Sequence, residues 1–251
     1  MSTTPNPKSS PAAESRRQFL KRSGQVAAAS SLAGMVVPKC HAQGDSAIRL
    51  ALIGCGSRGS GAVANAFAAT GGPVKLHAMA DLFENRLDGS HKRLSEQFPD
   101  KVDVPPERRF VGFDAYKRAI DLLGPGDVAM LTTHANFRPM QFEYAVAKGV
   151  NVFAEKSFAV DAPATRRWLK AAELSEQKKL KMACGLMWRH SKARQEVIQR
   201  IHDGAIGDVN MLRIYRVHGP SHCPPLPAGT NELLFQLQRA SRFTWGCGGF
   251  L

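Results

Sequence analysis

Short apolar segments alternate with longer amphipathic segments from residue 48 to residue 203. The apolar segments have the length and the flanking glycines of buried strands, whereas the amphipathic segments have apolar residues at helical spacing. Regular alternation of strand and helix predicts a parallel sheet covered by helices on both faces. The expected strands are 48–54, 74–81, 108–111, 127–133, 150–155 and 180–186, and the expected helices are 59–70, 82–98, 114–123, 139–148, 161–177 and 191–203.

The pattern changes after Gly207. Residues 209–218 alternate apolar and polar side chains, which predicts an antiparallel strand. Residues 219–229 are rich in proline and glycine and are expected to form a loop. Asp114 and Asp161 stand where helix N-caps are expected. We place a domain boundary near Phe158.

The first predicted strand ends in the sequence GCGSRG, with glycines at positions 54, 56 and 59. This spacing between a strand and a helix is typical of a dinucleotide-binding turn. Gly54 permits the tight turn, Gly56 lets the backbone approach a pyrophosphate, and Gly59 lets the helix pack near the strand. Ser57 and Arg58 complete the predicted phosphate site, where Arg58 could neutralise a phosphate. The helix N-terminus offers unpaired N–H groups to the same anion.

Asp81 ends the second predicted strand, about 20 residues after the turn, where the fingerprint requires an acid. Its carboxylate can accept hydrogen bonds from a ribose 2′-OH and would repel a 2′-phosphate, which predicts NAD as the cofactor. Arg86 keeps NADP open as an alternative. The other alternative is a structural glycine turn that holds no nucleotide.

The N-terminal residues carry the sequence SRRQFLK over 15–21, followed by a weakly apolar segment over 24–37. This order resembles a twin-arginine export signal, and small residues favour cleavage after Ala42. We expect residues 1–42 to be a signal peptide with a disordered leader. The mature chain is then periplasmic, meets the twin-arginine translocase during export and has no stable membrane anchor. A basic amphipathic helix is the alternative.

The net charge is +13, from 34 Lys and Arg against 21 Asp and Glu. The excess is scattered and accompanies no zinc-finger, RNA-binding or basic-zipper pattern, so a solvated basic surface is expected and no nucleic-acid partner. The five cysteines lack metal-binding spacing, and no metal is expected. Cys55 and Cys184 are expected to be buried, and a disulfide between Cys223 and Cys247 stays open.

Two further segments, VFAEKS at 152–157 and GAIGDV at 204–209, accompany the glycine turn and Asp81. Together they resemble the glucose-fructose oxidoreductase, inositol dehydrogenase and MocA (Gfo/Idh/MocA) family. The resemblance implies an α/β fold, with a Rossmann doubly wound parallel sheet over 47–158 followed over 159–251 by an α/β domain with a mostly antiparallel sheet. It also implies a homo-oligomer in the full-length form and hydride transfer between NAD(P) and a sugar, polyol or related hydroxyl compound.

The resemblance implies that Glu155 lies beside the nicotinamide ribose and that Lys156 reaches the reacting hydroxyl as the catalytic residue. Ser157 replaces the family's proline, which would have fixed the backbone φ angle. Thr133 and Asn136, after the fourth strand, are the further expected cofactor-binding residues.

Arg189 and His190, after the sixth strand, are the expected substrate-binding residues, although a surface ion pair and a helix-start role remain the alternatives. His134 stands where the family has proline, after Thr133.

In the family, a Gly-Gly-x-Leu segment continues into a helix with an Asp-x-x-x-His motif, whereas this sequence ends at Leu251. We therefore expect a truncated second domain and an impaired acid–base set. His134, His218 and His222 are conceivable replacements. Two alternative functions remain beside the dehydrogenase, namely an NAD-dependent glycosidase of the same fold and an inactive nucleotide-binding fragment.

Overall fold

The computed structural model describes residues 47–69, 71–215 and 224–247. The export signal predicted over 1–42 lies outside these residues, as do His218, His222 and Cys223. Among the described residues, no helix is both long and apolar enough to cross a membrane.

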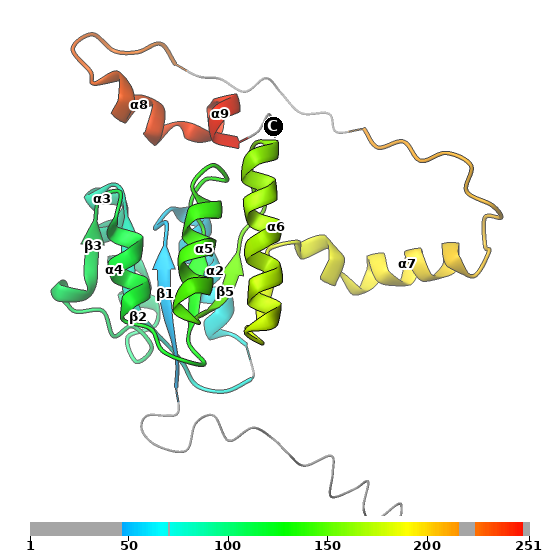
Figure 1. The fold of residues 1–251 in the computed structure, drawn as a ribbon, viewed down its shortest axis with the longest axis horizontal. Helices are drawn as coiled ribbons and strands as arrows, with labels where there is room; N and C mark the ends of the chain where they lie inside the picture. Colours follow the sequence, from blue (N-terminus) through cyan, green and yellow to red (C-terminus); the bar gives the residue numbers. More distant parts are fainter. Residues whose placement is uncertain (1–46, 70, 216–223, 248–251) are drawn as a thin grey trace, which may run out of the picture. The chain divides into compact units, whose positions relative to one another are not determined.

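A six-stranded sheet forms the centre of the described fold, in the order β3-β2-β1-β4-β5-β6 (Figure 1). All of its neighbouring strands pair in parallel. The strands are β1 (Ile48–Ile53), β2 (Val74–Asp81), β3 (Arg109–Val111), β4 (Val128–Leu131), β5 (Asn151–Ala154) and β6 (Met182–Cys184). The predicted parallel α/β fold is therefore confirmed, and β6 extends the same sheet beyond Phe158. The domain boundaries themselves stay a prediction.

Helices connect the strands and cover both faces of the sheet. The long connections are α2 (Ser57–Phe67), α3 (Glu84–Gln97), α4 (Ala115–Asp121), α5 (Arg138–Lys148) and α6 (Ala162–Gln177). Beyond the sheet come α7 (Lys192–His202), α8 (Glu232–Gln238) and α9 (Thr244–Cys247). Short 3₁₀ turns are η1 (Pro106–Arg108), η2 (Met187–His190) and η3 (Ala240–Arg242).

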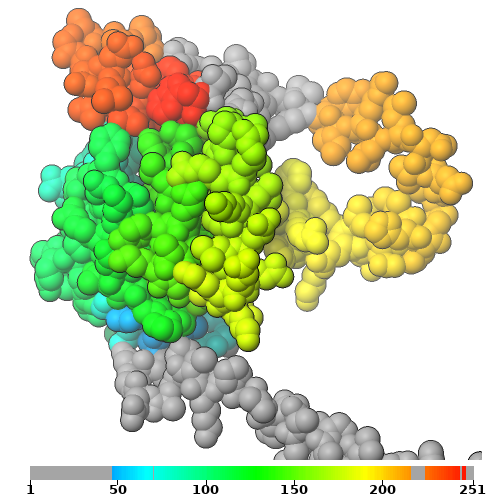
Figure 2. Space-filling model, viewed as in Figure 1, coloured from blue at the N-terminus to red at the C-terminus, as the bar shows by residue number. Residues whose placement is uncertain are grey.

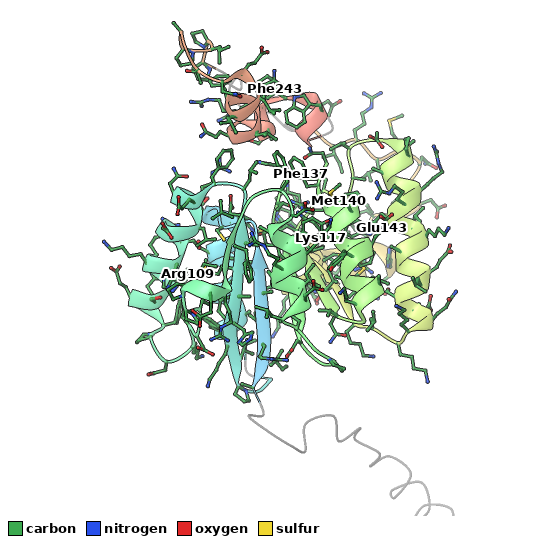
Figure 3. The ribbon with its side chains drawn as sticks, turned by 60° about the vertical axis from the view of Figure 1, so that its left-hand side comes forward. Arg109, Lys117, Phe137, Met140, Glu143 and Phe243 are labelled. Carbon is green, nitrogen blue, oxygen red and sulfur yellow. The ribbon has the colours of Figure 1, made fainter. Side chains whose placement is uncertain are left out.

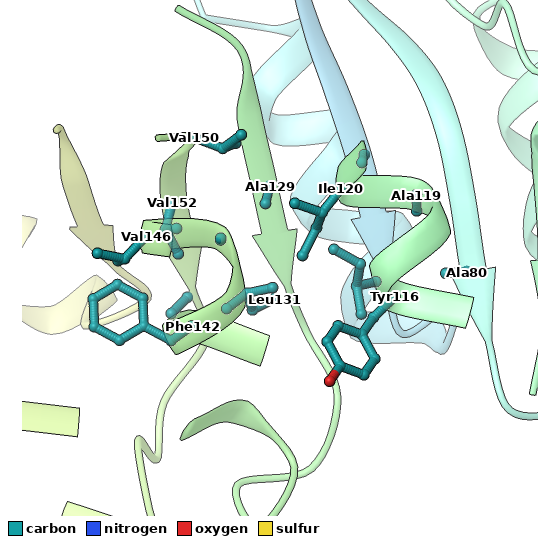
Figure 4. Packing of buried hydrophobic residues seen from close by; sticks show 14 of the residues in the cluster. Ala80, Tyr116, Ala119, Ile120, Ala129, Leu131, Phe142, Val146, Val150 and Val152 are labelled. Atoms are coloured by element: carbon teal, nitrogen blue, oxygen red, sulfur yellow. The ribbon is translucent and has the colours of Figure 1, made fainter. Parts of the chain in front are cut away.

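The central strands bury alternate residues in two separate cores, as the two-residue period of a strand requires. Ala51 and Ile53 pack with α4, α5 and α6, whereas Leu50 and Leu52 pack with α2 and α3. On the face that α4, α5 and α6 cover, alanines such as Ala129 let the helices approach the sheet closely, and Figure 4 shows this packing. Figure 2 shows the outer surface of the same helices. A doubly wound arrangement follows from these two cores.

The two predicted aspartate caps have different outcomes. Asp161 caps α6 as predicted, and its Oδ1 accepts a hydrogen bond from the N–H of Ala164 at 2.7 Å. Asp114 is the N-cap residue of α4 as predicted, but its side chain makes no capping hydrogen bond. The Asp114 backbone (φ −93°, ψ 3°) departs from the extended conformation usual for a capping residue. Its carboxylate instead pairs with Lys117 Nζ at 2.7 Å.

The antiparallel strand predicted over 209–218 is not formed in the part that the structure describes, residues 209–215. Its apolar side chains, including Met211, Leu212 and Ile214, are exposed. A strand is stable only when its N–H and C=O groups pair with a neighbouring strand. No described strand pairs with this segment, so an alternating pattern alone does not produce a strand here.

Asp127 joins the amino-terminal ends of β1 and β4. Its Oδ1 accepts the N–H of Arg49 at 3.0 Å, and its Oδ2 accepts Arg49 Nε at 2.9 Å and the N–H of Gly124 at 2.8 Å. Arg49 Nη2 lies 2.6 Å from the same oxygen, and Asp127 is only 6% exposed. One buried carboxylate thus satisfies two backbone donors and a guanidinium.

Replacing Asp127 with alanine should lower the free energy of unfolding by about 2–3 kcal/mol, because these buried donors lose a charged acceptor. Asp121→Ala is the matched control, since Asp121 forms an exposed pair with Lys148 and should contribute less than about 1 kcal/mol. Urea unfolding of both variants measures the difference. Equal losses would contradict the structural role given to Asp127.

Candidate functional site

A cavity lies at the carboxyl edge of the sheet, where β1 is flanked by β2 on one side and β4 on the other. The connection after β1 leads to β2 on one side, and the connection after β3 leads to β4 on the other side of β1. Ligands of open α/β sheets bind where the strand order reverses in this way. The cavity has a volume of about 230 Å³. The sheet, its loops and its helices line it with Gly54, Gly56, Ser57, Arg58, Gly59, Asp81, Leu82, Phe83, Arg86, Thr132, Thr133, His134 and Phe137.

The protein's own packing requires two of the three glycines in the turn. Gly54 has a φ of +97°, and a Cβ there would lie 2.7 Å from the N atom of Thr133. A Cβ on Gly59 would lie 2.2 Å from the carbonyl oxygen of Gly54 and 2.7 Å from Thr132 Oγ1. Any side chain at either position would displace the turn from the end of β4.

Gly56 differs from the other two. Its φ is −70°, which any residue adopts, and a Cβ there would meet no atom within 4 Å. Folding therefore does not require glycine at this position. Gly56 lines the cavity, so its missing side chain leaves space at the surface where a ligand would lie against the backbone.

The first turn of α2 faces the same cavity through Gly56, Ser57 and Arg58. Gly56 is the N-cap and supplies no side-chain acceptor, and the first turn contains no acidic residue. The N–H groups at a helix start lack intrahelical partners and carry partial positive charge. This end of α2 therefore has the properties of an anion site.

Asp81 connects β2 with the glycine turn. Its Oδ2 accepts the N–H of Cys55 at 2.6 Å, and its Oδ1 accepts the N–H of Phe83 at 2.9 Å. Each carboxylate oxygen can accept a second hydrogen bond, so Asp81 can hold the turn and still accept a ligand hydroxyl. Burial raises the pKa of the Cys55 thiol, and the charge of Asp81 adds to this effect. The predicted burial of Cys55 is confirmed, whereas Cys184 is only partly buried.

Arg58 pairs with Glu155, across the space between α2 and the end of β5. Arg58 Nε donates to Glu155 Oε1 at 2.7 Å, and Arg58 Nη2 lies 2.6 Å from the same oxygen. Glu155 is 4% exposed. A Cβ on Gly185 would lie 2.7 Å from the Glu155 carboxylate, so this glycine leaves room for it. The arginine predicted to neutralise a phosphate is thus already bound to a carboxylate.

Of the predicted catalytic, substrate-binding and further cofactor-binding residues, only Thr133 lines the cavity. Lys156 is exposed directly after Glu155 and does not line the cavity. Thr133 lines it and donates through Oγ1 to Gln141 Oε1 at 2.7 Å. Asn136 does not line it, and its buried Oδ1 has no hydrogen-bond partner. Arg189 and His190 are exposed on η2, and His190 borders a separate apolar groove between α2 and β6.

Two residues that the sequence did not single out shape this site. Thr132 Oγ1 donates to the carbonyl oxygens of Ile53 at 3.1 Å and Gly54 at 2.6 Å, which ties β4 to the turn. Arg138 is 5% exposed and donates to backbone carbonyls at the ends of β4 and β5. Arg138 immediately follows Phe137, which Figure 3 places at the carboxyl edge of the strands. In the sequence, nothing indicated that an arginine in the first turn of α5 would be buried.

Two solved structures that share this fold are inositol dehydrogenases. Myo-inositol 2-dehydrogenase from Lactobacillus plantarum matches with a TM-score of 0.51 and 23% identity, over 65% of this chain and 43% of its own. The matched part of this chain shares the fold of the corresponding part of this dehydrogenase. Scyllo-inositol dehydrogenase from Lactobacillus casei, solved with NAD(H) and scyllo-inositol, gives 0.50 and 23% over 64% and 43%. This chain spans less than half of either structure. No protein-family model and no curated protein matches the sequence.

His134 lines the cavity beside two cations. Burial lowers the pKa of its imidazole, and the positive charges of Arg86 and Arg138 lower it further. The folded state therefore favours neutral His134, whereas in the unfolded chain it takes up a proton near its ordinary value of 6.5. The contribution of His134 to stability is complete above pH 6.5 and is lost as the pH falls through the lowered value.

His134→Asn should accordingly reduce the loss of stability between pH 7.5 and pH 5, because the variant cannot take up this proton on unfolding. Urea unfolding at the two pH values compares the variant with the wild type. His77 and His91 also have lowered pKa values, so the wild type keeps part of the slope in any case. Identical slopes for the two proteins would show that His134 is not held neutral.

Proposed function

We propose that this chain binds NAD in the cavity at the start of α2. The observation that supports this most directly is Gly56, which lines the cavity although the fold does not require glycine there. A pyrophosphate lying against that backbone would meet the free N–H groups of α2 and the positive end of its dipole. Gly54 and Gly59 serve the fold, and Gly56 serves the ligand.

Asp81 favours NAD over NADP. Its carboxylate lines the cavity at the end of β2 and retains acceptor capacity for a ribose 2′-OH. A 2′-phosphate in the same place would be repelled by this negative charge. Arg86 also lines the cavity and lies over the ring of Phe83, 5.0 Å from its centroid. This cation is what keeps NADP as the second candidate.

The proposed activity is oxidation or reduction of a sugar, polyol or related hydroxyl compound. A bound nicotinamide would accept or supply the hydride. In the oxidation direction, Lys156 as a neutral amine would take up the proton of the reacting hydroxyl, and in the reduction direction its ammonium form would return that proton. Glu155, fixed by Arg58, would orient the nicotinamide ribose. Arg189 and His190 are the proposed substrate contacts. The fold shared with the two inositol dehydrogenases supports this reaction class.

Gly56→Ala tests the cofactor site. The added methyl group should weaken NAD binding by about tenfold or more, because it occupies the path of the pyrophosphate. The free energy of unfolding should change by less than about 1 kcal/mol, since no protein atom lies within 4 Å of the new Cβ. Isothermal titration calorimetry and urea unfolding measure the two effects.

Gly61→Ala is the matched control, because it adds the same methyl group to α2 without lining the cavity. Its nearest neighbour would be Arg58 Nη1 at 3.9 Å, an ordinary contact. We expect NAD affinity within about twofold of the wild type. A wild-type protein without affinity for NAD or NADP, or equal effects of the two substitutions, would rule the proposal out.

We also propose that the protein is exported through the twin-arginine route to the periplasm, as the sequence SRRQFLK indicates. Changing both Arg16 and Arg17 to lysine should retain the protein in the cytoplasm, and cell fractionation followed by immunoblotting detects this. Arg22→Lys is the control, because it keeps the pair intact. Undiminished periplasmic protein in the double variant would exclude this route.

A further inference from the structure

Arg138 is a buried cation at the first residue of α5, 5% exposed. Its Nη1 donates to the carbonyl oxygen of Glu155 at 2.7 Å and to that of Ser157. Its Nη2 donates to the carbonyl oxygen of Thr133. One guanidinium therefore binds backbone from the ends of two adjacent strands, β4 and β5.

The carbonyls of Glu155 and Ser157, which Arg138 binds, lie on either side of Lys156 in the sequence. The carbonyl of Thr133 comes from the segment that lines the cavity. Because a guanidinium is planar and its donors are fixed relative to one another, binding to all of these oxygens fixes the two strand ends relative to each other. The backbone of Lys156 is held on both sides.

Glu155 receives a second constraint through its side chain. Arg58 Nε and Nη2 both contact Glu155 Oε1, at 2.7 and 2.6 Å. Its backbone is held by Arg138 and its carboxylate by Arg58, so neither end of the residue is free to turn. Lys156 follows directly, and its Cα position is set by these contacts.

Burial of a guanidinium opposes folding, because the cation loses its hydration and only its hydrogen bonds offset this loss. Burial lowers the pKa of Arg138 to about 10, against the opposing effect of the Glu155 carboxylate. Its Nε has no hydrogen-bond partner. Ser157 has no ring to fix its φ angle, so this loop lacks an internal constraint and depends on an external one.

We infer that Arg138 is a positioning residue that holds the backbone of Lys156 in place where β4 and β5 end. This inference rests on the proposed function for the role of Lys156, but the contacts that carry it belong to the protein alone. A displacement of about 1 Å at a reacting group can cost on the order of 10²-fold in rate. Arg138 acts through Lys156 and Glu155 and does not itself line the cavity.

The test uses the full chain with Arg138→Lys, which keeps the charge but replaces the fork with a single ammonium group. Backbone ¹⁵N relaxation of the ligand-free protein should give order parameters of about 0.85 for Lys156 and Ser157 in the wild type and below about 0.6 in the variant. The rest of α5 should keep its wild-type values. Unchanged order parameters at Lys156 would overturn the inference.

Arg109→Lys is the matched control, since Arg109 Nε donates to the carbonyl oxygen of Val104 at 2.9 Å, at a different place in the sheet. It removes an arginine–carbonyl bond and should leave Lys156 as rigid as in the wild type. Arg138→Gln, which has no buried charge, replaces R138K in the same measurement if R138K does not fold. Loss of order at Lys156 in R109K as well would show a general loosening and would count against Arg138.

Binding separates this inference from the proposed function. NAD and ADP-ribose, which lacks the nicotinamide, are titrated into the wild type and R138K. We expect NAD affinity to fall by about tenfold in R138K, because a displaced Glu155 would lose roughly one charge-assisted hydrogen bond to the nicotinamide ribose. The affinity for ADP-ribose should stay within about twofold of the wild type. Equal losses for both ligands would contradict a role at the nicotinamide end. A wild type that binds neither ligand would refute the proposed function. The order parameters would still show whether Arg138 holds the backbone of Lys156.

Discussion

The contact between the β1–α2 turn and the end of β4 determines the geometry of the whole carboxyl edge. Gly54 and Gly59 bring backbone so close to Thr132 and Thr133 that no Cβ fits. The hydroxyl of Thr132 then bonds the carbonyls of Ile53 and Gly54. Without this approach, α2 would stand farther from the sheet, and its N-terminus would not face the cavity.

Three charged side chains, Asp81, Arg138 and Arg58, join the other strand ends along this edge of the sheet. Asp81 holds the turn to β2 through the N–H of Cys55. Arg138 ties the ends of β4 and β5, and Arg58 reaches from α2 to Glu155. Charged groups thus connect four neighbouring strands at one end of the sheet. At the other end, Asp127 and Arg49 make a comparable connection between β1 and β4.

The sequence predicted the parts of the fold that depend on local signals. Apolar segments of strand length and the G-x-G-x-x-G turn located the six strands and the carboxyl-edge site, and Asp81 fell where the fingerprint required it. Asp161 capped its helix, whereas Asp114 did not, because capping depends on the backbone conformation and not on residue type alone. Residues 209–215 alternate as a strand does, yet no described neighbour pairs with them.

The residues that the sequence could not identify act over long separations. Arg138 receives its role from carbonyls at positions 133, 155 and 157, and an arginine at a helix start is ordinarily a solvated residue. Thr132 is indistinguishable in sequence from any strand threonine. The distinction between Gly56 and its two neighbouring glycines likewise appears only when the surroundings of each Cβ are known.

The ion pair between Arg58 and Glu155 would couple anion binding at the start of α2 to the contact between α2 and the end of β5. Arg58 also lines the cavity beside the N-terminus of α2, so an anion bound there would compete with Glu155 for the same guanidinium. By thermodynamic reciprocity, a bound anion would weaken the Arg58–Glu155 ion pair, and any change that loosens this pair would strengthen anion binding. The affinity of the turn for an anion and the strength of an ion pair to the end of another strand are in this way linked.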